Sequence, residues 1–367
     1  MSTYTTQEDN QPLYFVLTLL AAVTGWFFFA EGWLVFYVVF ELSLIPIFLI
    51  ILGWGYQRER LKASKALVFY TISGSIPLIL ILSIIANFGC SHIFQVSQST
   101  RDRDLVQLIM VAATTGFLVK LPICCLHIWL PKAHVEAPVY GSIFLAAVLL
   151  KIGGWGLIKV APHVSNLSGW LSLLAGVSLW GLIIINLICI QSSDLKVLIA
   201  FSSVRHIGIA FLSLRSGTQR GFNAMLMIIL GHGIRSSLMF FYSYLFYVNS
   251  ATRSLLLNKT LKVKAGLIAV LWGVSCVGMI GGPPTINLWF EVRAFLCILR
   301  TLGARAKFLF WRVFLTGVYT LICLRSVYSG NQVYNQVNFA LLKPVRALNI
   351  LYHSVFLFRL CFLFFSL

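Results

Sequence analysis

Charged side chains are scarce in this sequence. Only 10% of its 367 residues are charged, 59% are hydrophobic, and the mean hydropathy is +0.90. A soluble globular domain carries about 25% charged residues, because its surface must be hydrated. The scarcity excludes a water-soluble fold and places the chain in a lipid bilayer.

Acidic residues are the scarcest charged group. The sequence has 10 Asp and Glu against 28 Lys and Arg, which gives a formal net charge of +18. A large basic excess can indicate nucleic-acid binding, but that requires a basic stripe or patch in a polar segment. Here the basic residues lie mostly in short connections between apolar runs, where they set membrane topology and contact anionic lipid head groups. We therefore expect membrane lipids, and no nucleic acid, among the partners.

Cofactor motifs are missing as well. The eight cysteines form no C-x-x-C pair, and Cys124 and Cys125 are adjacent, which does not suit a metal clamp. The sequence contains no phosphate-binding loop, dinucleotide fingerprint or H-E-x-x-H motif. We expect no cofactor and no metal on this chain. The first twelve residues hold Glu8, Asp9 and no Lys or Arg, unlike a signal or transit peptide, so a mitochondrial protein of this kind is expected to be made inside the organelle.

Long apolar runs fill the rest of the sequence. A membrane-spanning helix needs about 20 mostly apolar residues, and this criterion predicts an all-α membrane protein with about eleven spans. The predicted spans are 13–30, 32–53, 66–88, 105–127, 138–160, 169–190, 196–214, 221–248, 265–299, 307–325 and 346–366. The basic connections favour a matrix or cytoplasmic location for the connection at 58–65 and for that at 259–264.

Two of the spans are predicted to be broken. Span 265–299 carries Gly281-Gly282-Pro283-Pro284 in its middle, and span 105–127 contains Pro122. Because proline has no N–H, each break leaves backbone carbonyls without a helical partner. Such carbonyls occur at membrane depth only where protein buries them or where they line a wet cavity.

Four ionisable residues lie deep within apolar runs: Glu41, Lys120, Lys151 and Glu291. A charge at the bilayer centre costs from about 3 to more than 10 kcal/mol, so these groups are expected to face one another or water. Lys120 and Glu291 also lie close to the two predicted breaks, an arrangement typical of transporters with sites near the midplane. Lys159 and Arg325 lie near span ends, where a long side chain reaches the interface, so we predict a structural role for them.

Three histidines are candidates for proton relays, because imidazole titrates near neutrality. His127 follows Lys120 and Cys124 at positions that share one helix face, if the helix is locally regular. His206 follows Ser202 and Ser203, and His232 precedes Ser236 by one turn. The alternative for each histidine is a structural hydrogen bond, and the sequence leaves both interpretations open.

The segment from Lys120 to Gly156 reads KLPICCLHIWLPKAHVEAPVYGSIFLAAVLLKIGGWG. It closely resembles the subunit 4 family of mitochondrial NADH:ubiquinone oxidoreductase, complex I. FELSLIP at 40–46, DLKVLIAFSSVRHIG at 194–208, GHGIRSSLMF at 231–240 and PPTINLWFE at 283–291 match that family in order. The resemblance is strong from about residue 32 to residue 291 and weakens beyond about residue 300.

The resemblance implies a fold and a function. It implies one antiporter-like membrane domain over 1–367, with two inverted five-helix repeats at about 13–160 and 169–325 and a last helix at 346–366. It implies proton translocation in the mitochondrial inner membrane, beside other membrane-arm subunits, including neighbouring antiporter-like ones. Flavin, iron–sulfur clusters and ubiquinone are then expected on other subunits. The implied proton-transfer residues are Glu41, Lys120, Lys151 and Glu291, with His127, His206 and His232 as possible relays.

The sequence also departs from the family pattern. The family's first three helices have no counterpart here, Arg205 stands beside His206, and Arg235 replaces a small or neutral residue. Arg293 follows Glu291 by two residues and is a candidate partner for it. Two alternatives stay open at this point: a subunit of a multi-subunit cation/proton antiporter, and an assembly scaffold whose channel is inactive.

Overall fold

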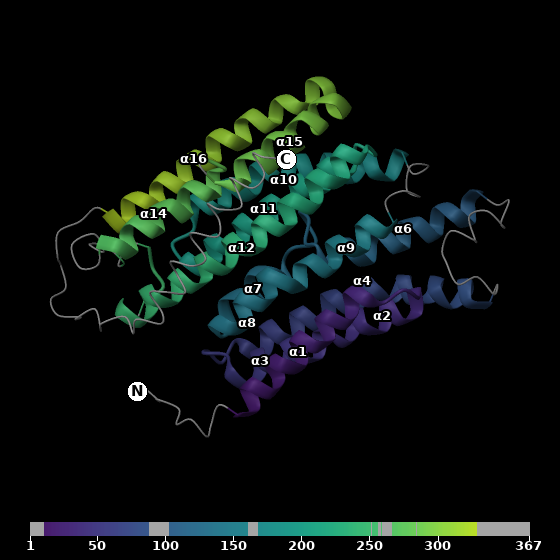
Figure 1. The fold of residues 1–367 in the computed structure, drawn as a ribbon, viewed down its shortest axis with the longest axis horizontal. Coiled ribbons are helices and arrows are strands. Elements are labelled where there is room, and N and C mark those ends of the chain that lie inside the picture. The colour runs from purple at the N-terminus through teal and green to yellow at the C-terminus, as the bar shows by residue number, and fades with distance from the viewer. Residues whose placement is uncertain are drawn as a thin grey trace. The chain divides into compact units, whose positions relative to one another are not determined.

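The computed structural model describes residues 11–87, 103–160, 168–250, 252–255, 258, 266–283 and 285–328 (Figure 1). These residues are helical almost throughout. Within the described ranges there is no strand, only an isolated bridge between Asp194 and Ser254. The predicted all-α class is confirmed.

The chain divides into two compact units, and the first comprises Met1–Leu121 and Ile128–Ser168. Its described α-helices are α1 (Gln11–Phe29), α2 (Trp33–Leu42), α3 (Leu44–Trp54), α4 (Arg60–Asn87), α6 (Arg103–Lys120), α7 (Trp129–Glu136), α8 (Val139–Phe144) and α9 (Leu150–Val160). A π-helical turn, Leu145–Leu149, joins α8 to α9. Helix α4 packs against α6 and α7, and α6 packs against α9. The ends of α2 and α6 lie within this packing. They carry the first of the candidate sites described below.

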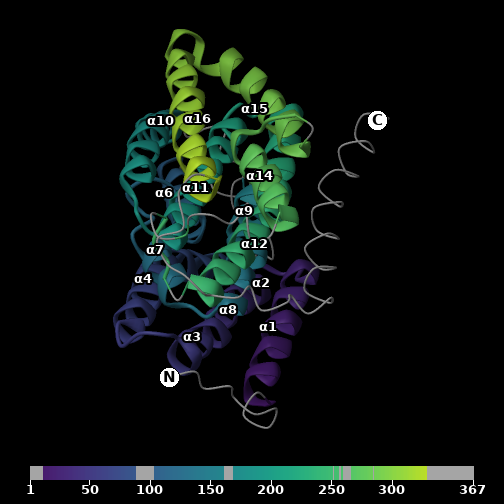
Figure 2. The ribbon, with the colours of Figure 1, turned by 90° about the vertical axis from the view of Figure 1, so that its left-hand side faces the viewer.

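The second unit comprises Pro122–His127 and Gly169–Leu367. Its described α-helices are α10 (Ser168–Gln191), α11 (Leu195–Leu214), α12 (Gln219–Ser250), α14 (Gly266–Ile280), α15 (Ile286–Leu302) and α16 (Lys307–Tyr328). Helices α11 and α12 pack side by side, α15 packs on both, and α14 packs on α16 (Figures 1 and 2). This arrangement brings polar residues from α11, α12, α15 and α16 together.

The distribution of side chains is that of a membrane protein. Large apolar side chains lie outermost, such as Phe29 and Phe310, which are 82% and 76% exposed, whereas arginine, lysine and glutamate side chains are buried among the helices. In the described part of the chain, eight helices are long and apolar enough to cross a membrane, and 111–120 and 269–280 form shorter apolar helices. The total of about eleven spans and the inverted repeats stay predictions. The predicted span 346–366, the basic connection 259–264 and Pro284 lie outside the described residues.

Candidate functional site

Lys120 and Glu41 form an ion pair in the first unit, in which the lysine is buried and the glutamate is partly exposed. The Lys120 ammonium lies 3.8 Å from a Glu41 carboxylate oxygen, and Lys120 is 5% exposed. The ammonium also donates to the backbone carbonyl of Phe40 and lies 3.2 Å from the centre of the Phe40 ring. The carbonyl is available because α2 gives way to α3 at Ser43, whose hydroxyl donates to the same oxygen at 2.7 Å. A carboxylate, a carbonyl and an aromatic face therefore hold one cation away from water.

Helix α6 ends at Lys120, as the proline at position 122 predicts. Leu121 still donates to the carbonyl of Phe117 at 2.8 Å, and the Trp129 indole N–H donates to the Val119 carbonyl at 3.0 Å. The expectation that Lys120, Cys124 and His127 share a helix face is wrong. The helical register stops at Lys120, and Cys125 has a φ of 74°, which no α-helix contains.

His127 lies beyond this break, in the second unit. Its ring centre is 5.8 Å from that of Phe201, and its buried Nδ1 has no hydrogen-bond partner within the described residues. The structure therefore gives His127 an aromatic contact with Phe201 and a backbone neighbour at Ile123.

Lys151 lies at the start of α9, next to the π-helical turn. Its ammonium donates to the carbonyl of Ala146, and the side chain is 8% exposed. A π-turn leaves carbonyls outside the α-helical bonding pattern, and such turns are frequent at functional sites. Gly153, two residues later, lets α9 approach the end of α6, because a Cβ there would lie 2.9 Å from the Leu121 nitrogen. Lys151 is thus placed by a helix irregularity, as Lys120 is.

The second unit contains the predicted break at 281–285. Helix α14 ends at Ile280 and α15 begins at Ile286, with Gly281 at a φ of +75°. The carbonyl of Met279, which Pro283 deprives of its helical donor, accepts a 2.9 Å hydrogen bond from Arg205. The carbonyl of Gly278 accepts from Arg235 at 3.1 Å and from Asn287 at 3.1 Å. The prediction that the break is real and that protein buries its free carbonyls is confirmed for the residues described.

Glu291 is paired with Arg312 of α16, through hydrogen bonds of 2.9 and 3.1 Å to its two carboxylate oxygens. His206 Nδ1 lies 3.2 Å from one of those oxygens. The expected pairing of Glu291 with Arg293 is wrong, because the Arg293 guanidinium donates to the Met227 sulfur at 3.5 Å on the exposed side of α15. Arg312 is 0% exposed and was missed, since it lies close to the start of a predicted span, where a basic side chain usually reaches the interface.

Arg205 lies against His206. The Arg205 guanidinium contacts His206 Nε2, and it also donates to Thr316 Oγ1 at 2.9 Å. The His206 ring therefore lies between the Arg205 guanidinium and the Glu291 carboxylate.

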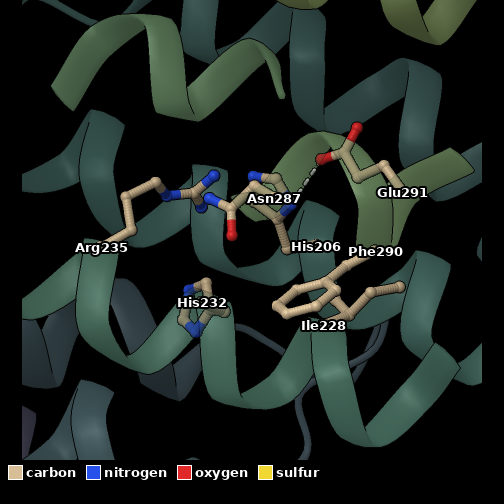
Figure 3. A pocket seen from close by; sticks show the side chains of 7 residues that line it. All are labelled: His206, Ile228, His232, Arg235, Asn287, Phe290 and Glu291. Carbon is tan, nitrogen blue, oxygen red and sulfur yellow. Dashed lines mark ion pairs between the residues drawn. The ribbon is translucent and has the colours of Figure 1, made fainter. Parts of the chain in front are cut away.

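His206 and His232 line a small cavity together with Arg235, Asn287, Glu291, Ile228 and Phe290 (Figure 3). The centres of the two imidazole rings are 5.9 Å apart. The hydroxyls of Ser202, Ser203 and Ser236 donate to backbone carbonyls of their own helices, so they do not extend a hydrogen-bonded chain from the histidines. Within the part of the chain that the structure describes, no group of three or more His, Cys, Asp or Glu residues could hold a metal ion.

Residues 30–320 match the family model described as "NADH:quinone oxidoreductase/Mrp antiporter, TM". NADH-ubiquinone oxidoreductase chain 4 of Lumbricus terrestris is 37% identical over 307 residues, which cover 83% of this chain and 68% of the relative. The chain 4 protein of Artemia franciscana is 42% identical over 293 residues, which cover 79% and 74%. This chain belongs to the NADH-ubiquinone oxidoreductase chain 4 family.

Solved structures of low sequence identity share the chain 4 fold. A chain of respiratory complex I from Thermus thermophilus superposes with a TM-score of 0.81 at 22% identity, covering 94% of this chain and 77% of that one. A chain of the Mrp complex from Dietzia sp. superposes with a TM-score of 0.80 at 18% identity, covering 88% and 62%. At these identities the likeness concerns the fold, which the two assemblies have in common.

Proposed function

We propose that this chain is a proton-translocating membrane-arm subunit of respiratory complex I, NADH:ubiquinone oxidoreductase. It acts in the mitochondrial inner membrane beside other membrane-arm subunits, including antiporter-like neighbours. The observation that carries the proposal is the Lys120–Glu41 pair at a helix break, in a chain of the chain 4 family. We expect the flavin, iron–sulfur clusters and ubiquinone of the complex on other subunits, and proton movement on this one.

The pair has the physical properties that a proton-transfer step needs. Burial in a low-dielectric medium disfavours the ammonium form of Lys120, and the nearby Glu41 carboxylate favours it. Because the two effects oppose one another, a small change in the distance between the groups switches the lysine between holding and releasing a proton. We propose that Lys151 in the first unit, and Glu291 and His232 in the second, are further proton-transfer residues.

The two alternatives are less supported. The fold does not exclude the antiporter hypothesis, since a chain of the Mrp complex superposes on this chain as well as the complex I chain does. The sequence relatives separate the two readings, because the curated proteins at 34–42% identity carry the name NADH-ubiquinone oxidoreductase chain 4. A scaffold with an inactive channel would have no need to bury a lysine beside a glutamate, since a buried charge pair is costly and adds little stability.

Substitution of Lys120 tests the function directly. In the purified complex reconstituted into vesicles, NADH oxidation and proton uptake are measured together. We expect Lys120→Met to assemble and to lose most of its proton transport per electron. Lys120→Arg should fail as well, because a guanidinium holds its proton at any accessible pH. Lys65→Met, at an exposed position of α4, is the matched control and should keep the normal ratio.

The outcomes of this experiment distinguish the three hypotheses for the function of the chain. An unchanged proton-to-electron ratio in either Lys120 variant would make the lysine structural and favour the scaffold. Proton transport that follows a sodium or potassium gradient and ignores NADH would favour the antiporter. Absence of the chain from a purified NADH dehydrogenase would contradict the proposed function altogether.

A further inference from the structure

The polar cluster of the second unit has more positive than negative charge. Arg205, Arg235 and Arg312 are 0%, 2% and 0% exposed, and the carboxylate among them is Glu291. From residue 169 to residue 367 the sequence has only two acidic side chains, Asp194 and Glu291. Arginine stays protonated in proteins. The three arginines and Glu291 therefore leave an excess of two positive charges in the cluster.

Asp194 does not offset this excess. It caps the start of α11, where its side chain accepts from the Lys196 backbone N–H at 2.9 Å. Arg205 lies eleven residues further along the same helix, which corresponds to about 16 Å at a rise of 1.5 Å per residue. The two helix ends at the break do not offset it either, because the carbonyl end of α14 and the amide end of α15 carry opposite half charges.

An uncompensated buried ion costs several kcal/mol even after relaxation of the surrounding protein. A lipid head group or a carboxylate of a neighbouring subunit cannot reach these arginines, since their side chains are covered within this chain. A counter-charge small enough to enter the cluster would lower the cost. A monatomic anion has that size.

The cavity next to Arg235 provides the space. It is lined by Arg235, His232, Asn287, His206, Glu291 and two apolar side chains, and it has room for about one water molecule. Figure 3 shows the Arg235 guanidinium beside the Asn287 amide, and each group gives one N–H to the Gly278 carbonyl at 3.1 Å. Asn287 is in the first turn of α15, whose free N–H groups attract anions. The Glu291 carboxylate on the far wall is already neutralised by Arg312.

We propose that this cavity binds one monovalent, chloride-sized anion between Arg235, His232 and Asn287. The anion halves the charge excess of the cluster. Sulfate, phosphate and gluconate are too large for a space of this size. The proposal concerns anion binding alone, so its test does not depend on whether the chain transports protons.

Bromide in place of chloride tests the site in the intact complex. Crystals of the complex soaked in bromide should show an anomalous peak within hydrogen-bond distance of the Arg235 guanidinium. In solution, chloride should raise the Tm of the complex in a saturable way, relative to gluconate at equal ionic strength. Arg235→Gln should abolish the chloride effect. Arg293→Gln should retain it, because Arg293 lies on the exposed side of α15, does not line the cavity, and donates to the Met227 sulfur.

Two results would overturn the proposal. One is a bromide map without a peak in the cavity. The other is a chloride effect of equal size in Arg235→Gln, which would place the anion elsewhere. If Arg235→Gln does not assemble, the bromide map of the unmodified complex decides the question by itself.

Discussion

Arg312 holds both carboxylate oxygens of Glu291, through hydrogen bonds of 2.9 and 3.1 Å that connect α16 to α15. Both side chains are buried, at 0% and 5% exposure. A bidentate pair of this kind has a fixed geometry, so it sets the position of the carboxylate as well as its charge. His206 completes the arrangement, with its Nδ1 3.2 Å from an oxygen of the same carboxylate.

Breaking this pair on one side should be far more damaging than removing it altogether. Arg312→Gln takes from the Glu291 carboxylate the two hydrogen bonds that fix its position, and loss of one partner of a buried pair costs about 3–5 kcal/mol. We expect a lower Tm and less assembled complex. In the double variant with Glu291→Gln, stability should recover in part, because no carboxylate is left behind. A double variant that is less stable than Arg312→Gln would contradict this account of the pair.

Gly281 gives a second prediction. Its φ of +75° is a conformation that side chains rarely adopt, and a Cβ there would lie 3.0 Å from a Glu291 carboxylate oxygen. Gly281→Ala should therefore destabilise the complex by about 1–2 kcal/mol from the backbone alone. It should also displace the Glu291 carboxylate and lower the proton transport per electron.

The matched control for Gly281→Ala is Gly317→Ala, in the middle of α16, where an added Cβ meets nothing within 4 Å. Alanine is favoured over glycine inside a helix by about 0.5–1 kcal/mol, so this variant should be as stable as the unmodified protein or slightly more so. Equal losses of stability in both variants would show that the conformation of Gly281 is not what the break requires. Tm values of the purified complexes make the comparison.

The ends of the broken helices could be predicted from the sequence alone. The prolines at 122 and 283 remove specific backbone donors, so the ends of α6 and α14 follow from local chemistry. The proximity of Lys120 and Glu41, a hypothesis from the family resemblance, is confirmed at 3.8 Å. Their role in proton transfer stays a prediction.

Other features depend on packing that no local pattern encodes. Arg312 is buried only because α16 lies against α14 and Glu291 of α15 faces it, while its sequence position suggests a side chain that reaches the interface. The π-helical turn at Leu145–Leu149 contains no proline or glycine. The interruption of the second span at Ser43 was not predicted, although Pro46 follows it by three residues and cannot donate to the Leu42 carbonyl. Each places a carbonyl against a lysine, so these unpredicted irregularities form part of the candidate site.

Lys151 supplies the last prediction, because its two possible roles can be separated. As a structural group, its ammonium satisfies the Ala146 carbonyl in the π-helical turn. As a proton carrier, it must also release its proton. Lys151→Arg keeps a donor for the carbonyl and cannot release a proton, whereas Lys151→Met lacks both functions. We therefore expect Lys151→Arg to assemble well and Lys151→Met to assemble less, with proton transport per electron reduced in both.

Lys159, at the other end of α9, is the matched control. Its ammonium donates to the Ala30 carbonyl at 3.1 Å and lies 4.7 Å from the centre of the Phe36 ring, in a half-buried position. A lysine near a span end reaches the interface and needs no proton transfer, so Lys159→Met should leave the proton-to-electron ratio unchanged. Normal transport in Lys151→Arg would show that the donor alone matters at position 151. Lys151 would then serve only to stabilise the π-helical turn. The proposed proton transfer in the first unit would depend on Lys120 and Glu41 alone.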